Sequence, residues 1–292
     1  MADCFFMAEK LTTILSIGGS DCMGGAGIQT DLRVSAEMGL HCMTVITAVT
    51  AQNSKGIHAL NDVPAHMVQS QLDSILSEIR PNTVKIGMIG NLENGRVISD
   101  ILRQLPKKTS VIIDPLLAAS KGGNLIKDNN SIDFKKEIVR FFIDNLFPYA
   151  TVVTPSTSEA NFFAEENNIL YGNDKDYAAK LLEVLGCKGL VLKGGDSDGN
   201  IVKDLLAIKT DVGILFDEFT SKRIDCNNLH GTGCAFGAYL ATYMAKGFSL
   251  QESFQLASFM MKKIISDSCD YSLGASLYGP LNITGYELKS IF

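Results

Sequence analysis

The sequence predicts an α/β fold in which a mainly parallel sheet is flanked by helices on both faces. Short apolar runs rich in β-branched residues recur along the chain, and glycine or polar residues follow most of them. Segments with apolar residues every three or four positions lie between the runs. Such runs are typical of strands that are buried on both faces. A parallel sheet between helices is the simplest arrangement that accommodates this alternation.

Six apolar runs are predicted to be buried strands. They cover residues 11–17, 43–50, 84–89, 111–113, 151–153 and 189–192. Two shorter runs, 205–209 and 213–219, are separated by three residues and are expected to form an antiparallel hairpin late in the chain.

Periodic apolar residues predict the helices between these strands. The first helix has Ile28, Leu32 and Ala36 at i, i+4 and i+8. The other apolar stripes are Val68, Leu72, Ile75, Leu76 and Ile79; Val97, Ile98, Ile101, Leu102 and Leu105; Phe134, Ile138, Phe141 and Phe142; and several positions within 249–265.

The chain has 292 residues, of which 46% are hydrophobic, and it shows no repeat, low-complexity tract or linker. We therefore expect one domain over residues 11–292. Residues 1–10 (MADCFFMAEK) are expected to be an N-terminal extension, with Met7 as an alternative start, because their apolar patch is too short for a signal peptide and follows no basic segment. No segment approaches the roughly 20 apolar residues of a membrane span.

Charge and cysteine usage restrict the partners and the compartment. The net charge is −6 and there is no basic block, which disfavours nucleic acid as a partner. The seven cysteines are scattered and form no Cys-x-x-Cys pair. A disulfide framework or a zinc site is therefore disfavoured, and a reducing cytoplasm is expected.

A glycine-rich segment, 17–28, follows the first predicted strand and leads into a helix. A dinucleotide fingerprint is disfavoured because Thr30 stands at the third glycine position and the second strand does not end in an acid. A tight turn that needs positive φ angles remains an alternative. The favoured interpretation is a backbone that a small ligand approaches closely, since five glycines surround the polar pair Ser20 and Asp21.

The segment 228–239 (NLHGTGCAFGAY) predicts a site for an anion. Gly231 and Gly233 allow successive N–H groups to converge at the start of a helix, whose positive end attracts phosphate. The chain has no Gly-Lys dipeptide and therefore no Walker A loop. Cys234 at this helix start is expected to have a lowered thiol pKa. The alternative is that Cys234 is a small core residue.

Eight segments in this order resemble the ribokinase-like family of small-molecule kinases, and most closely the hydroxymethylpyrimidine/phosphomethylpyrimidine kinases of thiamine biosynthesis. They are 16–21 (SIGGSD), 24–32 (GGAGIQTDL), 45–53 (VITAVTAQN), 85–88 (KIGM), 114–115 (DP), 154–155 (TP), 193–195 (KGG) and 230–234 (HGTGC). The resemblance implies a ribokinase-like fold, ATP and Mg²⁺ as cofactors, and a homodimer.

The resemblance also implies roles for the residues around the phosphate. His230, Gly231, Thr232 and Gly233 would form an anion hole over the phosphate in transfer, with Thr232 also on the nucleotide. Cys234 would accept the proton of the substrate hydroxyl as a thiolate, or only orient that hydroxyl as a thiol. Lys193 would contact the nucleotide phosphates.

Two acids would be linked to magnesium. Asp114 ends a strand and would position the ion directly or through water. The alternative is a helix N-cap, which Asp favours and which Pro115 as the first helical residue would suit. Glu159 would be the second acid. Ser156 stands where the family has asparagine, which puts that contact in doubt.

The acceptor pocket would contain Gly19, Asp31, Gln52 and Met88. Gln52 offers an amide to the polar edge of a pyrimidine and Met88 an apolar surface to its face. Asp31 would otherwise be a solvated residue of the first helix. The implied activity is phosphorylation of the hydroxymethyl group of 4-amino-5-hydroxymethyl-2-methylpyrimidine, and of its monophosphate. The alternatives are a pyridoxal kinase, or a ligand-binding relative that has lost catalysis.

Overall fold

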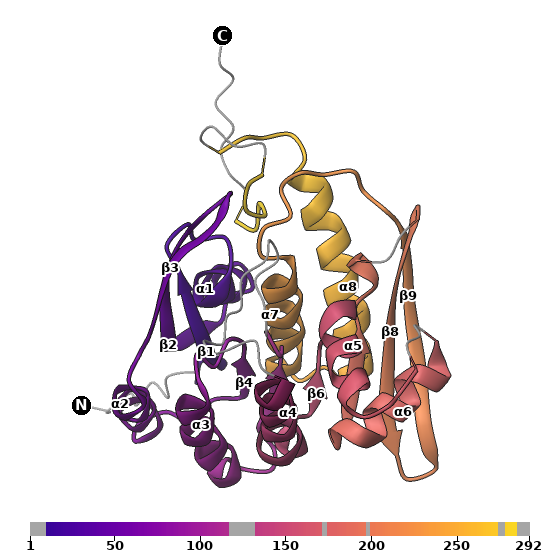
Figure 1. Cartoon of the computed structure of the whole chain (residues 1–292). Helices are drawn as coiled ribbons and strands as arrows, with labels where there is room; N and C mark the ends of the chain where they lie inside the picture. The colour runs from indigo at the N-terminus through magenta and orange to yellow at the C-terminus, as the bar shows by residue number, and fades with distance from the viewer. Residues whose placement is uncertain (1–9, 117–131, 171–173, 197–198, 274–277, 285–292) are drawn as a thin grey trace, which may run out of the picture.

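The computed structural model describes residues 10–116, 132–170, 174–196, 199–273 and 278–284, and the predicted extension at 1–10 lies almost entirely outside them. Within the described residues, nine strands form one sheet in the order β3-β2-β1-β4-β5-β6-β7-β8-β9 (Figure 1). The strands are β1 (Thr13–Asp21), β2 (His41–Asn53), β3 (Gly56–Asp62), β4 (Thr83–Ile86), β5 (Ser110–Ile113), β6 (Val152–Val153), β7 (Gly189–Leu192), β8 (Ile201–Thr210) and β9 (Gly213–Lys222).

The strands from β2 through β1, β4, β5 and β6 to β7 are parallel, and β3, β8 and β9 add antiparallel pairs at the two edges. The predicted late hairpin is confirmed as β8 and β9, which are longer than the apolar runs indicated. The fold class predicted from the sequence is therefore confirmed.

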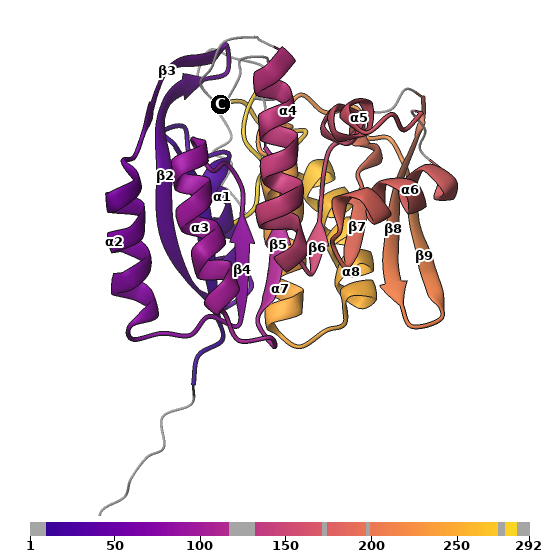
Figure 2. The same cartoon turned by 60° about the horizontal axis from the view of Figure 1, so that its bottom comes forward.

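Helices cover both faces of the sheet (Figure 2). The α-helices are α1 (Gly27–Glu37), α2 (Ala65–Leu76), α3 (Leu92–Gln104), α4 (Ile132–Phe141), α5 (Thr157–Glu166), α6 (Lys175–Leu185), α7 (Thr232–Ala245) and α8 (Leu250–Asp267). A π-helical turn, η1 (Phe142–Leu146), and two 3₁₀ turns, η2 (Phe147–Tyr149) and η3 (Gly194–Asp196), complete the described elements. No described helix combines the length and the apolar character that a membrane crossing requires.

Two hydrophobic cores lie on opposite faces of the sheet. On one face, α2 to α6 pack on alternate strand residues such as Leu15 and Ile17. On the other, α7 packs between α1 and α8 over Ile14 and Ile112. Because strand side chains alternate between the faces, a parallel strand supplies both cores at once, which explains its continuous apolar run.

Two local expectations were wrong. The first strand does not end before the glycines but continues through Gly18 and Gly19, where its register with β2 shifts by one residue. The buried face of α1 carries Ile28, Asp31 and Val34, whereas Leu32 is exposed. The apolar spacing misled because the protein buries a charged residue on this helix and pairs it within the fold.

The order of the strands creates a crevice. The chain proceeds outward from β1 to β2 and β3, and then returns to the other side of β1 with β4. At such a switch point the loops after adjacent strands separate, and ligands bind beyond the carboxyl ends of the strands. Asp21, Asp114 and Lys193 all stand at the carboxyl ends of strands or just beyond them.

Candidate active site

A cavity of about 800 Å³ opens at the carboxyl ends of the strands. Every residue that the sequence assigned to the site lines it, although these residues come from widely separated segments of the chain. They are Gly19, Asp31, Gln52, Met88, Asp114, Glu159, Lys193, His230, Gly231, Thr232, Gly233 and Cys234.

The start of α7 forms one wall of the cavity. Gly231 is the N-cap residue and has φ +88°, a left-handed conformation that favours glycine. A Cβ at Gly233 would lie 3.4 Å from Lys193 Nζ and 3.8 Å from Asp114 Oδ2. The N–H groups in the first turn of a helix have no partner within that helix. The helix start therefore combines amide donors with an ammonium and a carboxylate at short range.

Asp114 lies beneath this helix start and is 1% exposed. Its Oδ1 accepts hydrogen bonds from Lys193 Nζ at 2.9 Å and from Thr154 Oγ1 at 3.2 Å. Burial opposes the charge, but Lys193 and Lys85 outweigh it and lower the pKa of Asp114. Oδ2 is buried without a hydrogen-bond partner among the described residues. Residues 114–116 are not helical, so the N-cap alternative does not hold there.

Glu159 occupies the first turn of α5, where it forms a capping box with Ser156. Its Oε2 accepts from Ser156 N at 2.8 Å, and Ser156 Oγ accepts from Glu159 N at 3.3 Å. Burial, together with the charge of Asp114, raises the pKa of Glu159 against the opposing effect of Lys193. The serine that replaces the expected asparagine is thus the N-cap of α5.

The oxygen atoms around Asp114 suit Mg²⁺. This ion prefers oxygen ligands and keeps several waters, so few carboxylates suffice. The unpartnered Oδ2 of Asp114 is a buried carboxylate oxygen that lies close to Gly233 at the start of α7. The described residues contain no group of three or more His, Cys, Asp or Glu side chains that could enclose a metal. The set therefore fits an ion that is held largely by water and substrate phosphate.

Cys234 departs from the sequence prediction. Its residue is only 5% exposed, and burial raises the pKa of the thiol to about 11. Lys85 lowers that pKa, Asp114 and Asp31 raise it, and a hydrogen bond from the Gly27 backbone lowers it. The expected lowering of the pKa was wrong because burial and two carboxylates outweigh Lys85 and the Gly27 hydrogen bond. At neutral pH Cys234 is a thiol.

A buried ion pair that sequence reasoning missed lies beside this thiol. Lys85 on β4 is 2% exposed, and its Nζ donates to both oxygens of Asp31 at 2.9 and 3.0 Å. Ser16 Oγ also donates to Asp31 Oδ2 at 2.6 Å. Burial alone would lower the pKa of Lys85, but the charge of Asp31 raises it, so the ammonium persists. A lysine inside an apolar run that predicts a buried strand was the sequence feature that could have indicated this ion pair.

The acceptor side of the cavity combines an apolar cluster with the end of β2. Met88 is buried and packs with Ala48, Ile57 and Leu116. A Cβ at Gly19 would lie 2.9 Å from Met88 Sδ, so a larger residue there would displace the methionine. These contacts give the cavity an apolar side. Gln52 also lines the cavity, and its side chain hydrogen-bonds the Asp21 carboxylate.

Comparison with known proteins identifies the family. A model of the phosphomethylpyrimidine kinase family matches residues 21–282. The chain belongs to this family. It is 31% identical to the hydroxymethylpyrimidine/phosphomethylpyrimidine kinase of Bacillus subtilis over 280 residues, which cover 95% of this chain and 96% of that protein.

Two further similarities define the range of relatives. The chain is 32% identical to the thiamine biosynthetic bifunctional enzyme of Arabidopsis thaliana over 94% of its own length, but it spans about half (50%) of that enzyme. The structure of Staphylococcus aureus pyridoxal kinase in complex with AMP-PCP superposes with a TM-score of 0.79 at 25% identity and covers 94% of both chains. The fold is ribokinase-like, as predicted.

The raised pKa of Cys234 predicts how the thiol responds to alkylation. Only the thiolate reacts, so the iodoacetamide rate at Cys234 should rise about tenfold per pH unit from pH 7 to 10. Peptide mass spectrometry would follow Cys234, with the exposed Cys22 as an internal control for reagent access. A rate at Cys234 that is already flat with pH above 7 would contradict the raised pKa.

Loss of the buried Lys85 ammonium should destabilise the protein. Lys85→Met leaves the Asp31 carboxylate buried without its cation, which costs about 3–5 kcal/mol of the free energy of unfolding. Urea denaturation would measure the change. The control is Lys263→Met, which breaks an exposed pair with Asp267 at 3.2 Å and should cost no more than about 1 kcal/mol. Equal losses in the two variants would contradict the assignment.

Proposed function

We propose that the protein is a kinase that transfers the γ-phosphoryl group of ATP, with Mg²⁺, to the hydroxymethyl group of 4-amino-5-hydroxymethyl-2-methylpyrimidine and of its monophosphate. The observation that carries this proposal is the arrangement around Gly233, where an ammonium, a carboxylate with an unpartnered oxygen and the start of a helix lie together in one cavity. Family membership supports it.

Lys193 and the start of α7 would bind the transferring phosphate. The charges of Asp114 and Glu159 overcome burial and raise the pKa of Lys193, so its ammonium stays charged inside the cavity. The amides of Gly231 to Cys234, with Thr232 at the first helical position, would form the anion hole. Preorganised donors of this kind act where negative charge develops, in a region from which water is excluded.

Asp114 and Glu159 would hold Mg²⁺, Asp114 through its unpartnered Oδ2. When bound, the ion would neutralise negative charge on the nucleotide phosphates. The capping box that engages one oxygen of Glu159 also keeps this side chain at the cavity edge. Ser156 therefore supports the acid through local structure, which weakens the alternative of a relative that has lost catalysis.

Cys234 would orient the acceptor hydroxyl as a neutral thiol. Phosphoryl transfer proceeds through a loose transition state in which positioning contributes more than early removal of the hydroxyl proton. A thiol with a pKa of about 11 is suited to positioning rather than to proton abstraction at neutral pH.

Gln52, Met88 and Gly19 would bind the pyrimidine ring, by its polar edge and its apolar face. Asp31 contributes less directly than the sequence indicated, because Lys85 and Ser16 already bond to both of its oxygens. It would shape the base of the cavity.

The second candidate substrate is pyridoxal, which the similarity to the Staphylococcus aureus pyridoxal kinase structure favours. The homodimer and the cytoplasmic location expected from the sequence stay predictions.

An ADP-release assay tests the function directly. With ATP, Mg²⁺ and the pyrimidine, the purified protein should release ADP, and its kcat/KM for the pyrimidine should exceed that for pyridoxal.

Asp114→Asn should lower kcat about 10²–10³-fold, since it removes a charge that acts on the phosphates. Asp100→Asn, on the exposed face of α3, serves as the control. No ADP with either acceptor would refute the proposal, and a preference for pyridoxal would select the second candidate.

A further inference from the structure

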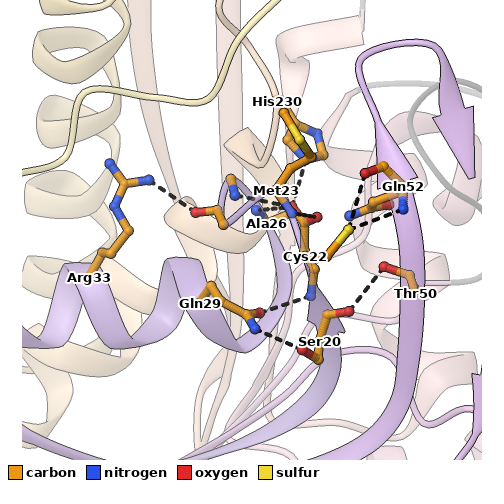
Figure 3. Close-up of polar contacts among 12 residues, drawn as sticks. Ser20, Cys22, Met23, Ala26, Gln29, Arg33, Thr50, Gln52 and His230 are labelled. Carbon is orange, nitrogen blue, oxygen red and sulfur yellow. Dashed lines mark hydrogen bonds and ion pairs between the residues drawn. The ribbon is translucent and has the colours of Figure 1, made fainter. Parts of the chain in front are cut away.

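Asp21, at the end of β1, connects two parts of the cavity wall. Figure 3 labels three of the residues that bond to it, Met23, Ala26 and His230. The Asp21 carboxylate is 2% exposed and accepts hydrogen bonds from the Gln52 side chain and from four further donors. Met23 N donates to Oδ1 at 2.8 Å, and Oδ2 accepts from Gly25 N at 3.1 Å and Ala26 N at 2.9 Å. These three amides belong to residues 22–26, which we call the glycine loop.

Another of these hydrogen bonds comes from a segment more than 200 residues away. His230 Nε2 lies 2.8 Å from Asp21 Oδ2, and His230 immediately precedes the N-cap residue of α7. Burial would raise the pKa of Asp21, but the hydrogen bonds from His230, Gln52 and Met23 lower it to about 2. One ionised carboxylate therefore ties the glycine loop to the segment that begins α7.

The backbones of these two segments are in direct contact. A Cβ at Gly231 would overlap the carbonyl oxygen of Gly25, and a Cβ at Gly25 would lie 2.8 Å from the Pro280 side chain and overlap the His230 ring. The two segments therefore pack so closely that only glycine fits at positions 25 and 231. The position of the α7 amides thus depends on the position of the glycine loop.

The glycine loop also leads directly to the sulfur of the site. Gly27 follows the loop as the first residue of α1, and its backbone hydrogen-bonds the Cys234 thiol. Arg33 on α1 donates to Gly24 O at 3.2 Å and to Leu281 O at 2.9 Å, which fastens the loop at a second point. Movement of the loop would therefore disturb the contact of Gly27 with Cys234 as well as displace the α7 amides.

We propose that Asp21 and His230 are a positioning pair that fixes the glycine loop against the start of α7, so that the anion hole and Cys234 keep their relative geometry. The sequence placed His230 with the catalytic residues, but its ring bonds to Asp21 and contributes through that contact. The kinetic part of this inference rests on the proposed function. A displacement of about 1 Å in a site of this kind can cost about 10²-fold in rate.

His230→Leu and His230→Gln separate positioning from packing. Leucine removes the donor, whereas the glutamine amide nitrogen can occupy the place of Nε2 and donate to Asp21. We expect kcat to fall about 10–100-fold in His230→Leu with less than about threefold change in the KM for ATP, and to stay within about threefold of wild type in His230→Gln. Asp21→Asn should resemble His230→Leu, and the double variant should lose no more than the worse single variant.

Alkylation of Cys234 tests the same pair without any assay of activity. In His230→Leu the iodoacetamide rate at Cys234 should rise at least about fivefold at pH 8, because the glycine loop no longer holds Gly27 against the sulfur. His230→Gln and the remote control Asp100→Asn should keep the wild-type rate. If Asp21→Asn does not fold, as judged by circular dichroism, the two His230 variants alone test the positioning pair.

The outcomes distinguish the pair from the function. Three results would each overturn the positioning pair. The first is wild-type kcat with wild-type alkylation in His230→Leu, and the second is a loss of kcat that His230→Gln does not rescue. The third is a double variant in which the losses of the single variants multiply. Absence of kinase activity in the wild-type protein, with the expected alkylation pattern, would reject the proposed function and leave the pair supported.

Discussion

The contact between Gly25 and Gly231 is the constraint on which the cavity depends. It brings the starts of α1 and α7 together, so that the backbone of Gly27 at the start of α1 hydrogen-bonds Cys234 in the first turn of α7. Two helix N-termini place partial positive charge at one point, which attracts phosphate without a Walker A loop. Only residues without a Cβ permit this approach, and Gly231 must also adopt a positive φ.

Charge balance inside the cavity follows from burial. Asp31 and Asp114 are carboxylates removed from water, and each has a lysine as its partner. Asp31 pairs with the buried Lys85, and Asp114 pairs with the partly buried Lys193. Buried charges persist only when they are paired and hydrogen-bonded. The pairing keeps both lysines charged, while burial, together with the nearby carboxylates, raises the pKa of the Cys234 thiol. The same arrangement therefore favours binding of phosphate and disfavours a thiolate base.

Local patterns succeeded where one physical factor dominated. The apolar runs at 111–113 and 189–192 coincide closely with β5 and β7, since a strand buried on both faces must be apolar throughout. Local sequence patterns gave wrong predictions where tertiary contacts compensated for an unfavourable local feature. The glycines after the first apolar run extend β1 because pairing with β2 and packing by Met88 replace the missing side chains. Asp31 occupies the buried face of α1 because Lys85 neutralises it.

The sequence by itself determined the fold class, the family, and twelve residues that line one cavity, because strand patterns and short motifs are local properties of the chain. Tertiary structure alone decided the protonation state of Cys234, the pairing of Lys85 with Asp31, the capping role of Ser156, and the bond between Asp21 and His230. Each of these depends on which groups meet after the chain folds and on how much water remains around them. Pairwise distance and desolvation are properties of the folded protein, and no spacing along the chain encodes them directly.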